Sequence, residues 1–277
     1  MELKDFSWSE KLAEICGIHA GDGYLRNDGK RIELEVGGNV KEERTYYDNY
    51  VIPLFSSVFK IDIKGKVFSS KGTYGFVIRQ RRIVEFLHRL GFPYGKKAHV
   101  VRVPKFIFSG GERLFTSFLR GYFDTDGTLN FDKRGKYHNY PRIILKTISK
   151  PLFLDIKKML LKLDFHFYTD TYKPKKPTEK PQYRIWIYGK HNLLKWMKLI
   201  GSKNPSKFTR FEIWKRFGFC PSHTSYKERI AILKGKINLC LIIYRAREVT
   251  RTACGASDPI VRVRIPPGPL VFGSKSG

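Results

Sequence analysis

"CGIHAGDGYL" (Cys16–Leu25) and "RGYFDTDGTL" (Arg120–Leu129) each close a predicted helix with an acid followed by glycine. A shift of 104 residues places Asp22 on Asp126 and aligns the small residues before the two acids. Because these small residues recur every four positions, they form a narrow stripe along one face of each helix. The stripes consist of Ala13, Gly17 and Gly21 in the first helix and of Ser117, Gly121 and Thr125 in the second.

The stripes predict that the two helices pack against each other. Glycine inside a helix costs about 0.5–1 kcal/mol relative to alanine, and close approach of two backbones is the usual compensation. We therefore expect Ala13, Gly17, Ser117 and Gly121 to line the helix interface. Helices packed in this way end together, so their terminal acids should converge.

Converging acids predict a cation site. Two close carboxylates resist joint ionisation, and the negative ends of two helix dipoles add to the demand for a cation. Mg²⁺, or Mn²⁺ in its place, combines one or two carboxylates with water and phosphate oxygens. We expect Asp22 and Asp126 to be metal ligands, with the carbonyls of Gly21 and Thr125 as further ligands. An ordinary Asp-Gly turn is the alternative for either acid alone, but the matched pair argues against it.

Similar elements follow each helix. In the first half, strand-like residues occupy 30–36, a helix is expected over 41–58, strands over 61–68 and 73–80, and a helix over 82–90. In the second half, the corresponding expectations are a strand over 140–148, a helix after Pro151, strands over 165–172 and 182–189, and a helix over 191–200. A further helix is expected within 201–219, opened by Asn204 and Pro205, with its lysines facing phosphates.

This order predicts an α+β fold of two pseudo-twofold αββαββα repeats. We expect an N-terminal half over 1–103, a linker over 104–111, a C-terminal half over 112–220 and an extension over 221–277. The extension is expected to be poorly ordered toward its end, because it shows no periodicity after 244.

Charge points to the class of partner. The chain has 277 residues and a net charge of +28, which favours a polyanion and above all nucleic acid. A solvated basic surface is the alternative. Four cysteines without C-x-x-C spacing predict neither a zinc site nor a disulfide framework. With no signal peptide and no long apolar run, the expectation is a cytoplasmic protein without membrane contact.

The paired motifs resemble those of monomeric LAGLIDADG homing endonucleases, and the likeness extends over roughly 7–220. The resemblance implies two sheets that form a DNA-binding saddle and a monomeric, site-specific endonuclease that hydrolyses phosphodiester bonds with divalent metal, as in intron homing. It also implies a catalytic lysine on the strand after the second motif, which is Lys146 here. The first half has Gly37 and Gly38 in the corresponding stretch, so we expect the halves to differ, unless Lys41 substitutes.

Sequence recognition in such a saddle uses polar side chains that reach base edges in the major groove. The expected DNA-contacting residues are Arg79, Gln80 and Arg81 in the first half, Lys136, His138 and Asn139 in a loop of the second half, and Gln182 and Arg184 on its later strand. Two other functions remain open on this fold: an intron RNA maturase and a DNA-binding regulator that does not cut. The paired acids argue against the regulator.

Overall fold

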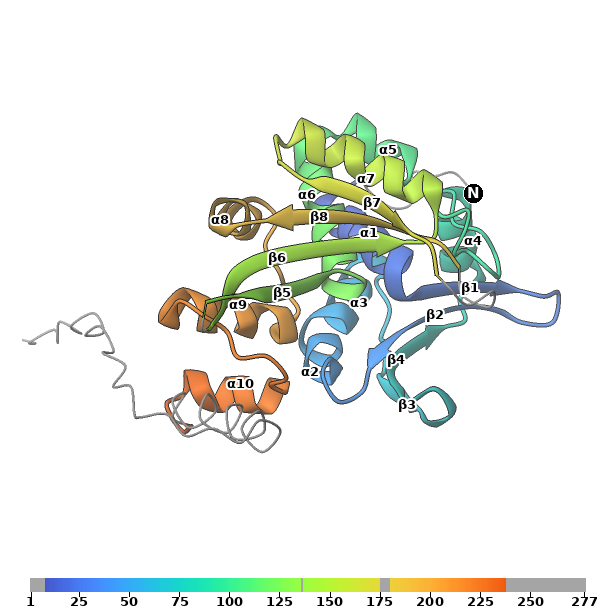
Figure 1. The fold of residues 1–277 in the computed structure, drawn as a ribbon. Coiled ribbons are helices and arrows are strands. Elements are labelled where there is room, and N and C mark those ends of the chain that lie inside the picture. Colours follow the sequence, from blue (N-terminus) through green and yellow to red (C-terminus); the bar gives the residue numbers. More distant parts are fainter. Residues whose placement is uncertain (1–7, 136, 175–179, 238–277) are drawn as a thin grey trace, which may run out of the picture. The chain divides into compact units, whose positions relative to one another are not determined.

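The computed structural model describes residues 8–135, 137–174 and 180–237, all of which belong to one compact unit (Figure 1). Lys136 and the chain after 237 lie outside the described residues, so the expectation that the end of the extension is poorly ordered also falls outside them.

The first half contains one αββαββα repeat. It begins with α1 (Glu10–Asp22), β1 (Gly23–Asn27) and β2 (Ile32–Asn39). A continuous helical stretch follows, made of α2 (Arg44–Tyr46), the π-helical turn Tyr47–Val51 and α3 (Ile52–Phe59). The repeat ends with β3 (Lys66–Phe68), a 3₁₀ turn at Ser69–Lys71, β4 (Thr73–Ile78) and α4 (Arg81–Arg89). Only the last three residues of the strand expected over 61–68 pair with a neighbour, so that prediction was too long.

The second half repeats this order. Its elements are α6 (Gly111–Thr125), β5 (Thr128–Arg134), β6 (Tyr137–Thr147), α7 (Lys150–Lys162), β7 (Tyr168–Tyr172), β8 (Gln182–Tyr188) and α8 (Lys190–Leu199). Within the described residues, three further helices stand outside the repeats: α5 (Lys105–Ser109), which lies in the expected linker, α9 (Pro205–Phe217) and α10 (Tyr226–Leu233). The expected cap is present, because the Asn204 side chain accepts a hydrogen bond from the Ser206 amide at the start of α9.

The repeats form two antiparallel sheets of the same topology. Sheet A has the order β1-β2-β4-β3, and sheet B has the matching order β5-β6-β8-β7. In sheet B, Pro141, Ile143 and Leu145 of β6 and Ile185 and Ile187 of β8 are buried on one face, and Tyr183 of β8 stacks on Phe153 of α7 on that side. The even-numbered positions face away from that side and form what we call the open face. The predicted α+β fold is therefore confirmed.

Helices α1 and α6 pack against each other at the centre of the fold. A Cβ atom on Gly17 would lie 2.1 Å from the carbonyl oxygen of Phe118, and one on Gly121 would lie 2.3 Å from that of Glu14. Both distances are far below van der Waals contact, so the backbones meet where only glycine fits. At the helix ends, Gly21 lies against the Thr125 side chain.

The described part of the chain contains no helix that is both long and apolar enough to cross a lipid bilayer.

Candidate active site

The two motif acids lie together where α1 and α6 end. Asp22 is the last residue of α1, and Asp126 caps α6. A Cβ atom built on Gly21 would lie 3.4 Å from the carboxyl carbon of Asp126, which places this carboxylate against the end of the neighbouring helix. Asp22 accepts a hydrogen bond of 2.8 Å from the hydroxyl of Tyr47.

The proximity of the acids changes their ionisation. Burial, followed by the negative charges of Asp126 and Glu43, raises the pKa of Asp22 to about 7, against the partial opposition of Tyr47 and Lys207. Desolvation raises the pKa of Asp126 as well, although its side chain remains exposed on one side, and three nearby lysines limit the rise. Two acids that resist ionisation in one place create the demand for a cation.

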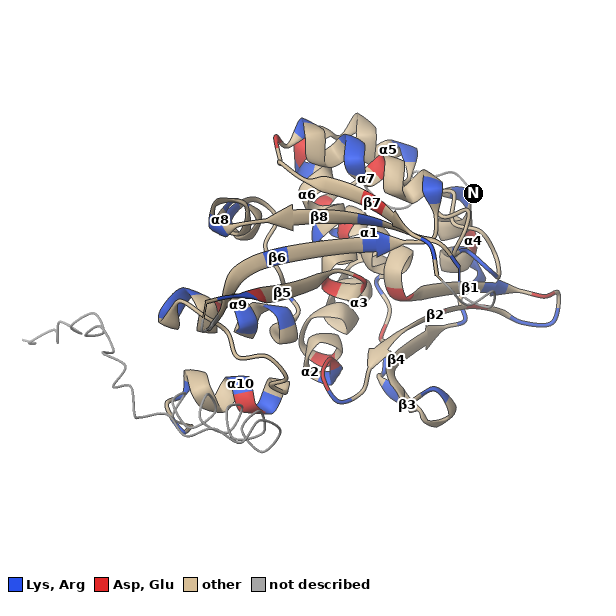
Figure 2. Ribbon diagram, in the orientation of Figure 1, with Lys and Arg blue, Asp and Glu red and all other residues tan. Residues whose placement is uncertain are grey.

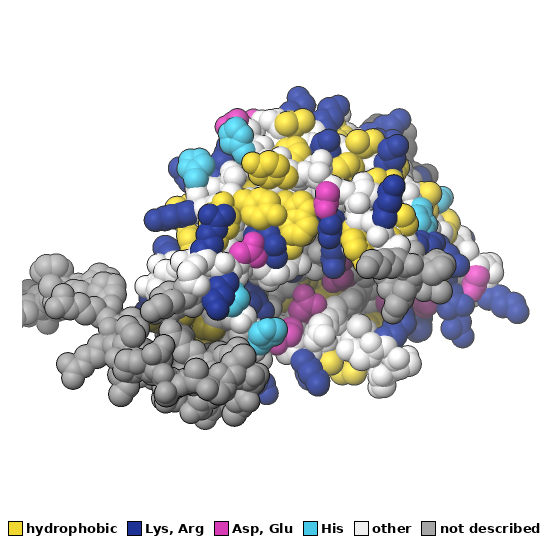
Figure 3. Space-filling view, viewed as in Figure 1, with side chains coloured by type: hydrophobic (Ala, Val, Ile, Leu, Met, Phe, Trp, Pro, Cys, Tyr) yellow, Lys and Arg dark blue, Asp and Glu magenta, His cyan; other side chains and the backbone are white. Residues whose placement is uncertain are grey.

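Asp126 lines a cavity of about 240 Å³ between the motif helices and sheet B. The cavity is lined by Gly21, Lys97, Asp126, Lys146 and Gln182, among others. Figure 3 shows acidic side chains gathered in the hollow between the two sheets, with Lys and Arg around them. This arrangement suits an anionic ligand that brings or shares a cation.

Two lysines, the half-buried Lys97 and the buried Lys207, hold the carbonyls at the helix ends, a role that the sequence analysis missed. Lys97 donates to the carbonyls of His19 and, at 2.7 Å, Gly21. Lys207 donates to the carbonyls of Asp124 at 2.5 Å and Thr125 at 3.4 Å. Lys207 was expected to face phosphates, and that prediction is wrong because its side chain is buried against α6.

The two lysines are counterparts in the repeat. A shift of 110 residues places Lys97 on Lys207 and aligns the end of α4 with the end of α8. The sequence shows this correspondence in "LGFPYGKK" and "IGSKNPSK", where the glycine of Leu-Gly or Ile-Gly lies six residues before the lysine. Burial lowers the pKa of Lys97 to about 8, while Asp126 and Asp22 oppose that shift.

Glu43 is a third carboxylate near the motif acids. It raises the pKa of both Asp22 and Asp126. Its two oxygens accept hydrogen bonds of 2.8 Å, one from the amide of Asn39 and one from the side chain of Asn204. Glu43 therefore links the first half to the start of α9, which carries Lys207.

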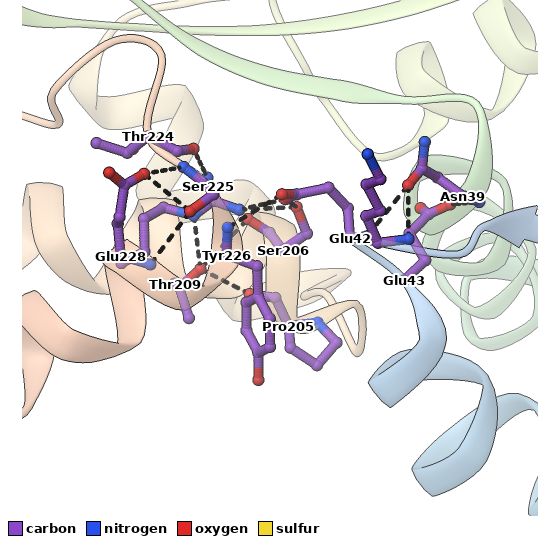
Figure 4. Close-up of polar contacts among 12 residues, drawn as sticks. Asn39, Glu42, Glu43, Pro205, Ser206, Thr209, Thr224, Ser225, Tyr226 and Glu228 are labelled. Atoms are coloured by element: carbon purple, nitrogen blue, oxygen red, sulfur yellow. Dashed lines mark hydrogen bonds and ion pairs between the residues drawn. The ribbon is translucent and has the colours of Figure 1, made fainter.

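The same junction is held by a neighbouring cluster of polar contacts (Figure 4). Glu42 accepts hydrogen bonds from Ser206 at 3.2 Å and from the amide of Tyr226 at 3.1 Å, and it pairs with Arg229 at 3.0 Å. Arg229 of α10 is completely buried and also donates to Thr209. The start of the expected extension thus packs on α9 and on the turn that carries Glu43.

Asp124 is an anchor for the loop before α9. Its buried carboxylate accepts hydrogen bonds from the Ser202 hydroxyl at 2.5 Å and from the amides of Lys203 and Asn204 at 2.6 and 3.2 Å. These contacts occupy both oxygens. Asp124 therefore stands apart from the pair formed by Asp22 and Asp126.

Lys146 lies on β6, where its exposed side chain lines the cavity and lowers the pKa of Asp126. In sheet B Lys146 pairs with Arg184, and at the matching position of sheet A Gly37 pairs with Gly75. Lys146 thus has no lysine counterpart in the first half. Lys41 lies in the turn after β2, where its amide bonds to Asn39.

The residues expected to contact DNA occupy three kinds of position. Gln182 and Arg184 lie on the open face of sheet B, where Arg184 pairs with Asp170. Arg79 follows β4 and pairs with Glu33 at 3.3 Å. The others correct the prediction: Gln80 and Arg81 begin α4 rather than continue a strand, and His138 and Asn139 belong to β6 rather than to a loop.

The donor atoms present fit a hard divalent cation only in part. Asp22, Asp126 and the carbonyls of Gly21 and Thr125 are oxygen donors of the kind that Mg²⁺ prefers. No group of three or more His, Cys, Asp or Glu side chains among the described residues could hold a metal ion by itself. Any such ion would need oxygen ligands from water or a phosphate as well, and it would share the carbonyls with Lys97 and Lys207.

Comparisons with known proteins agree with this geometry. Residues 115–201 match the family profile described as a LAGLIDADG-like domain. The chain is 29% identical over 209 residues to the replication factor C small subunit of Methanocaldococcus jannaschii, covering 75% of this chain and 10% of that protein. It is 26% identical over 186 residues to an A-type ATP synthase protein of Pyrococcus abyssi, covering 67% of this chain and 16% of that protein. The chain thus spans only a tenth to a sixth of these relatives.

Among solved structures, the chain is similar to I-DmoI in complex with DNA and Mn, with a TM-score of 0.48 and 14% identity over 69% of this chain and 96% of that one. It is also similar to the N-terminal LAGLIDADG domain of DUF199/WhiA, with a TM-score of 0.44 and 14% identity over 72% and 86% of the two chains. The family-profile match over residues 115–201 agrees with the resemblance seen in the motifs, and the first half has the same sheet topology as the second: the chain contains a LAGLIDADG-like domain.

Proposed function

We propose that this chain is a site-specific endonuclease that binds double-stranded DNA as a monomer and hydrolyses a phosphodiester bond in each strand. The observation that carries the proposal is the pair Asp22 and Asp126, which meet at the ends of two packed helices and resist ionisation. Lys and Arg occur on strands and helices of both halves, which suits a phosphate backbone (Figure 2). In a protein that only bound DNA, positive charges at these two positions would raise the affinity for phosphates. The presence of acids there therefore favours cleavage over binding alone.

Asp22 and Asp126 would hold the divalent cation, Mg²⁺ or Mn²⁺, with the carbonyls of Gly21 and Thr125 beside them. Such a cation activates water and stabilises the leaving oxygen of the phosphodiester. Lys146 reaches into the same cavity and would bind a phosphate oxygen of the bond to be cut. Lys97 and Lys207 hold the two helix ends and keep the acids in place.

The matched relatives support a self-contained module. The replication factor C and ATP synthase proteins have unrelated names, yet each contains a short stretch similar to most of this chain. Recurrence of a similar stretch in proteins of unrelated name supports a module that acts on its own, as a homing endonuclease would. On the same argument, an intron RNA maturase is the alternative that shares the fold and the basic surface.

The test uses a plasmid library with a randomised insert, incubated with the full chain and Mg²⁺, to select cleaved sequences. Asp22→Asn and Asp126→Asn should bind the selected duplex as the unchanged protein does, while cleavage falls by about 10³-fold or more. Asp28→Asn, in the exposed hairpin between β1 and β2, is the matched control and should cut normally. Normal cutting by both motif variants would overturn the proposal.

A further inference from the structure

The open face of sheet B carries a row of aromatic rings. Trp186 and Tyr188 of β8 lie with ring centroids 6.1 Å apart and planes only 6° from parallel. Tyr140 of β6 continues the row at 6.4 Å from Tyr188 and 25° from parallel. Tyr168 of β7, which is 71% exposed, meets Tyr188 edge-on at 5.9 Å. We call these four residues the aromatic row.

Polar partners hold the row in place. The indole N–H of Trp186 donates to Asp170 at 2.8 Å, and Arg184 donates to the same carboxylate through Nε at 2.9 Å. Asp170 therefore orients Trp186 before any ligand arrives, which reduces the entropy lost on binding. The guanidinium of Arg134 lies 3.5 Å from the ring centre of Tyr140.

Cations surround the rings. The guanidinium groups of Arg142 and Arg184 each lie 5.0 Å from the ring centre of Trp186. The acids on this face, Asp132 and Asp170, are paired with those same two arginines. Figure 3 shows the apolar surface over β6 and β8 with Lys and Arg at its edges. The face thus offers ring surfaces for bases and positive charge for phosphates.

The fold itself does not require these rings. The matching positions of sheet A follow from the pairing of Gly75 with Gly37 and of Arg184 with Lys146. In this alignment of the two repeats, Val77 of sheet A corresponds to Trp186 of sheet B, and Arg79 corresponds to Tyr188. Sheet A forms the same four strands without an aromatic row. Tyr168 is exposed and the other three rings are half-buried, and a partly exposed aromatic surface of this kind suits a binding site.

We propose that the aromatic row binds unpaired bases of a single-stranded nucleic acid by stacking. Stacking needs the flat side of a base, which a duplex covers with neighbouring bases while showing only base edges in its grooves. This binding uses none of the motif acids, although it shares the open face of sheet B with the duplex contacts expected for Gln182 and Arg184. Both RNA and locally melted DNA present the same chemistry.

Binding is measured through the fluorescence anisotropy of dye-labelled (dT) or (rU) strands of about 12 nucleotides, a length within the usual site sizes, while they are titrated with the full chain. About 200 mM salt suppresses the purely electrostatic part of the affinity. Trp196 and Trp214 are buried but Trp8 is 49% exposed, so intrinsic Trp fluorescence would not report Trp186 alone, whereas a label on the strand reports binding by every variant. We expect saturable binding of at least one of the two strands.

Trp186→Leu should weaken single-strand binding by roughly tenfold, the effect of losing one base–aromatic stack. Trp186→Phe keeps a ring and should retain most of the affinity, which separates stacking from a structural effect. Tyr24→Leu removes an exposed tyrosine of sheet A and is the matched control, expected to bind normally. Stronger binding of (rU) would identify RNA as the ligand, and equal binding any single strand.

Two results would overturn the proposal: unchanged affinity in Trp186→Leu, or no saturable binding of either strand. The Asp22→Asn variant keeps the aromatic row and should bind single strands normally. If no variant or unchanged protein cuts duplex DNA, the single-strand measurement still stands, so failure of the two proposals is distinguishable.

Discussion

The two halves share a backbone plan but carry different open faces. Sheet A presents Glu33 and Glu35, which are neutralised by Arg26, Arg79 and Lys71. Sheet B presents Ile144 in place of Glu35 and Lys146 in place of Gly37, together with the aromatic row. One face therefore has its charge cancelled internally, while the other keeps an exposed lysine beside the motif acids.

The contrast shows which features the fold needs and which a ligand would use. The glycine contacts between α1 and α6 and the lysines on the helix-end carbonyls occur in both halves. These repeated features hold the centre together. The features present in one half only, Lys146 and the aromatic row, lie on the surface, where they can be lost without unfolding the protein.

The largest expected effect tests the symmetric centre. Gly17→Ala and Gly121→Ala each push a Cβ atom into a backbone carbonyl of the facing helix, at 2.1 and 2.3 Å. Each should destabilise the fold by about 3 kcal/mol, the upper range for overpacking. Urea unfolding measures this, and Thr116→Ala on the exposed side of α6 is the control. A large loss in one variant alone would show that the halves are unequal at their centre.

Lys146→Ala tests the asymmetry of the cavity. Removing one charged group that stabilises the developing charge on a phosphate slows a reaction by about a hundredfold. Because Gly37 stands at the matching position, we expect the loss to fall mainly on one strand, so that nicked DNA accumulates. Strand-specific labels in the cleavage assay measure this. Equal slowing of both strands would contradict the assignment of Lys146 to one half.

The next effect concerns pH. The pKa of Asp22 is raised to about 7 from an ordinary value near 3.8, so the folded state binds more protons than the unfolded state between these values. Stability should therefore fall as pH rises through this range. In metal-free buffer, Asp22→Asn should be more stable than the unchanged protein by more than about 1 kcal/mol at pH 8, and should gain nothing from this source at pH 4.

Thermal unfolding in the presence of a chelator at the two pH values checks this expectation. Asp28→Asn serves as the comparison, since Arg31 and Arg26 lower the pKa of that exposed acid. A gain for Asp22→Asn that is as large at pH 4 as at pH 8 would disprove the charge-based explanation.

The smallest effect concerns the open faces. Glu35→Gln removes a negative charge from sheet A and should raise affinity for duplex DNA by about fivefold, corresponding to roughly 1 kcal/mol for an exposed charge. Ile144→Glu introduces the matching charge in sheet B and should lower affinity to a similar extent. Filter binding at two salt concentrations measures both. If neither substitution matters, the open faces do not contact DNA.

The sequence by itself was enough for the repeat, the position of the acids and most elements. Small residues every fourth position and an acid after each stripe are local signals, and each helix or strand is set by nearby residues. Alignment of the stretches that follow the two motifs also showed that the first half has glycine where the second has Lys146. Errors arose at element ends, because Gln80 and Arg81 pass from strand to helix within two residues.

Only the tertiary structure decided which side chains meet the acids. Lys97 and Glu43 lie 75 and 21 residues after Asp22. The repeated spacing after Leu-Gly and Ile-Gly marks Lys97 but does not tell what it contacts, and nothing local distinguishes Glu43 from other acids. They reach the helix ends because the loop after α4 and the turn after β2 return there in three dimensions. The same holds for Lys207, which a helical pattern would place in solvent but which the packing of α9 buries against α6.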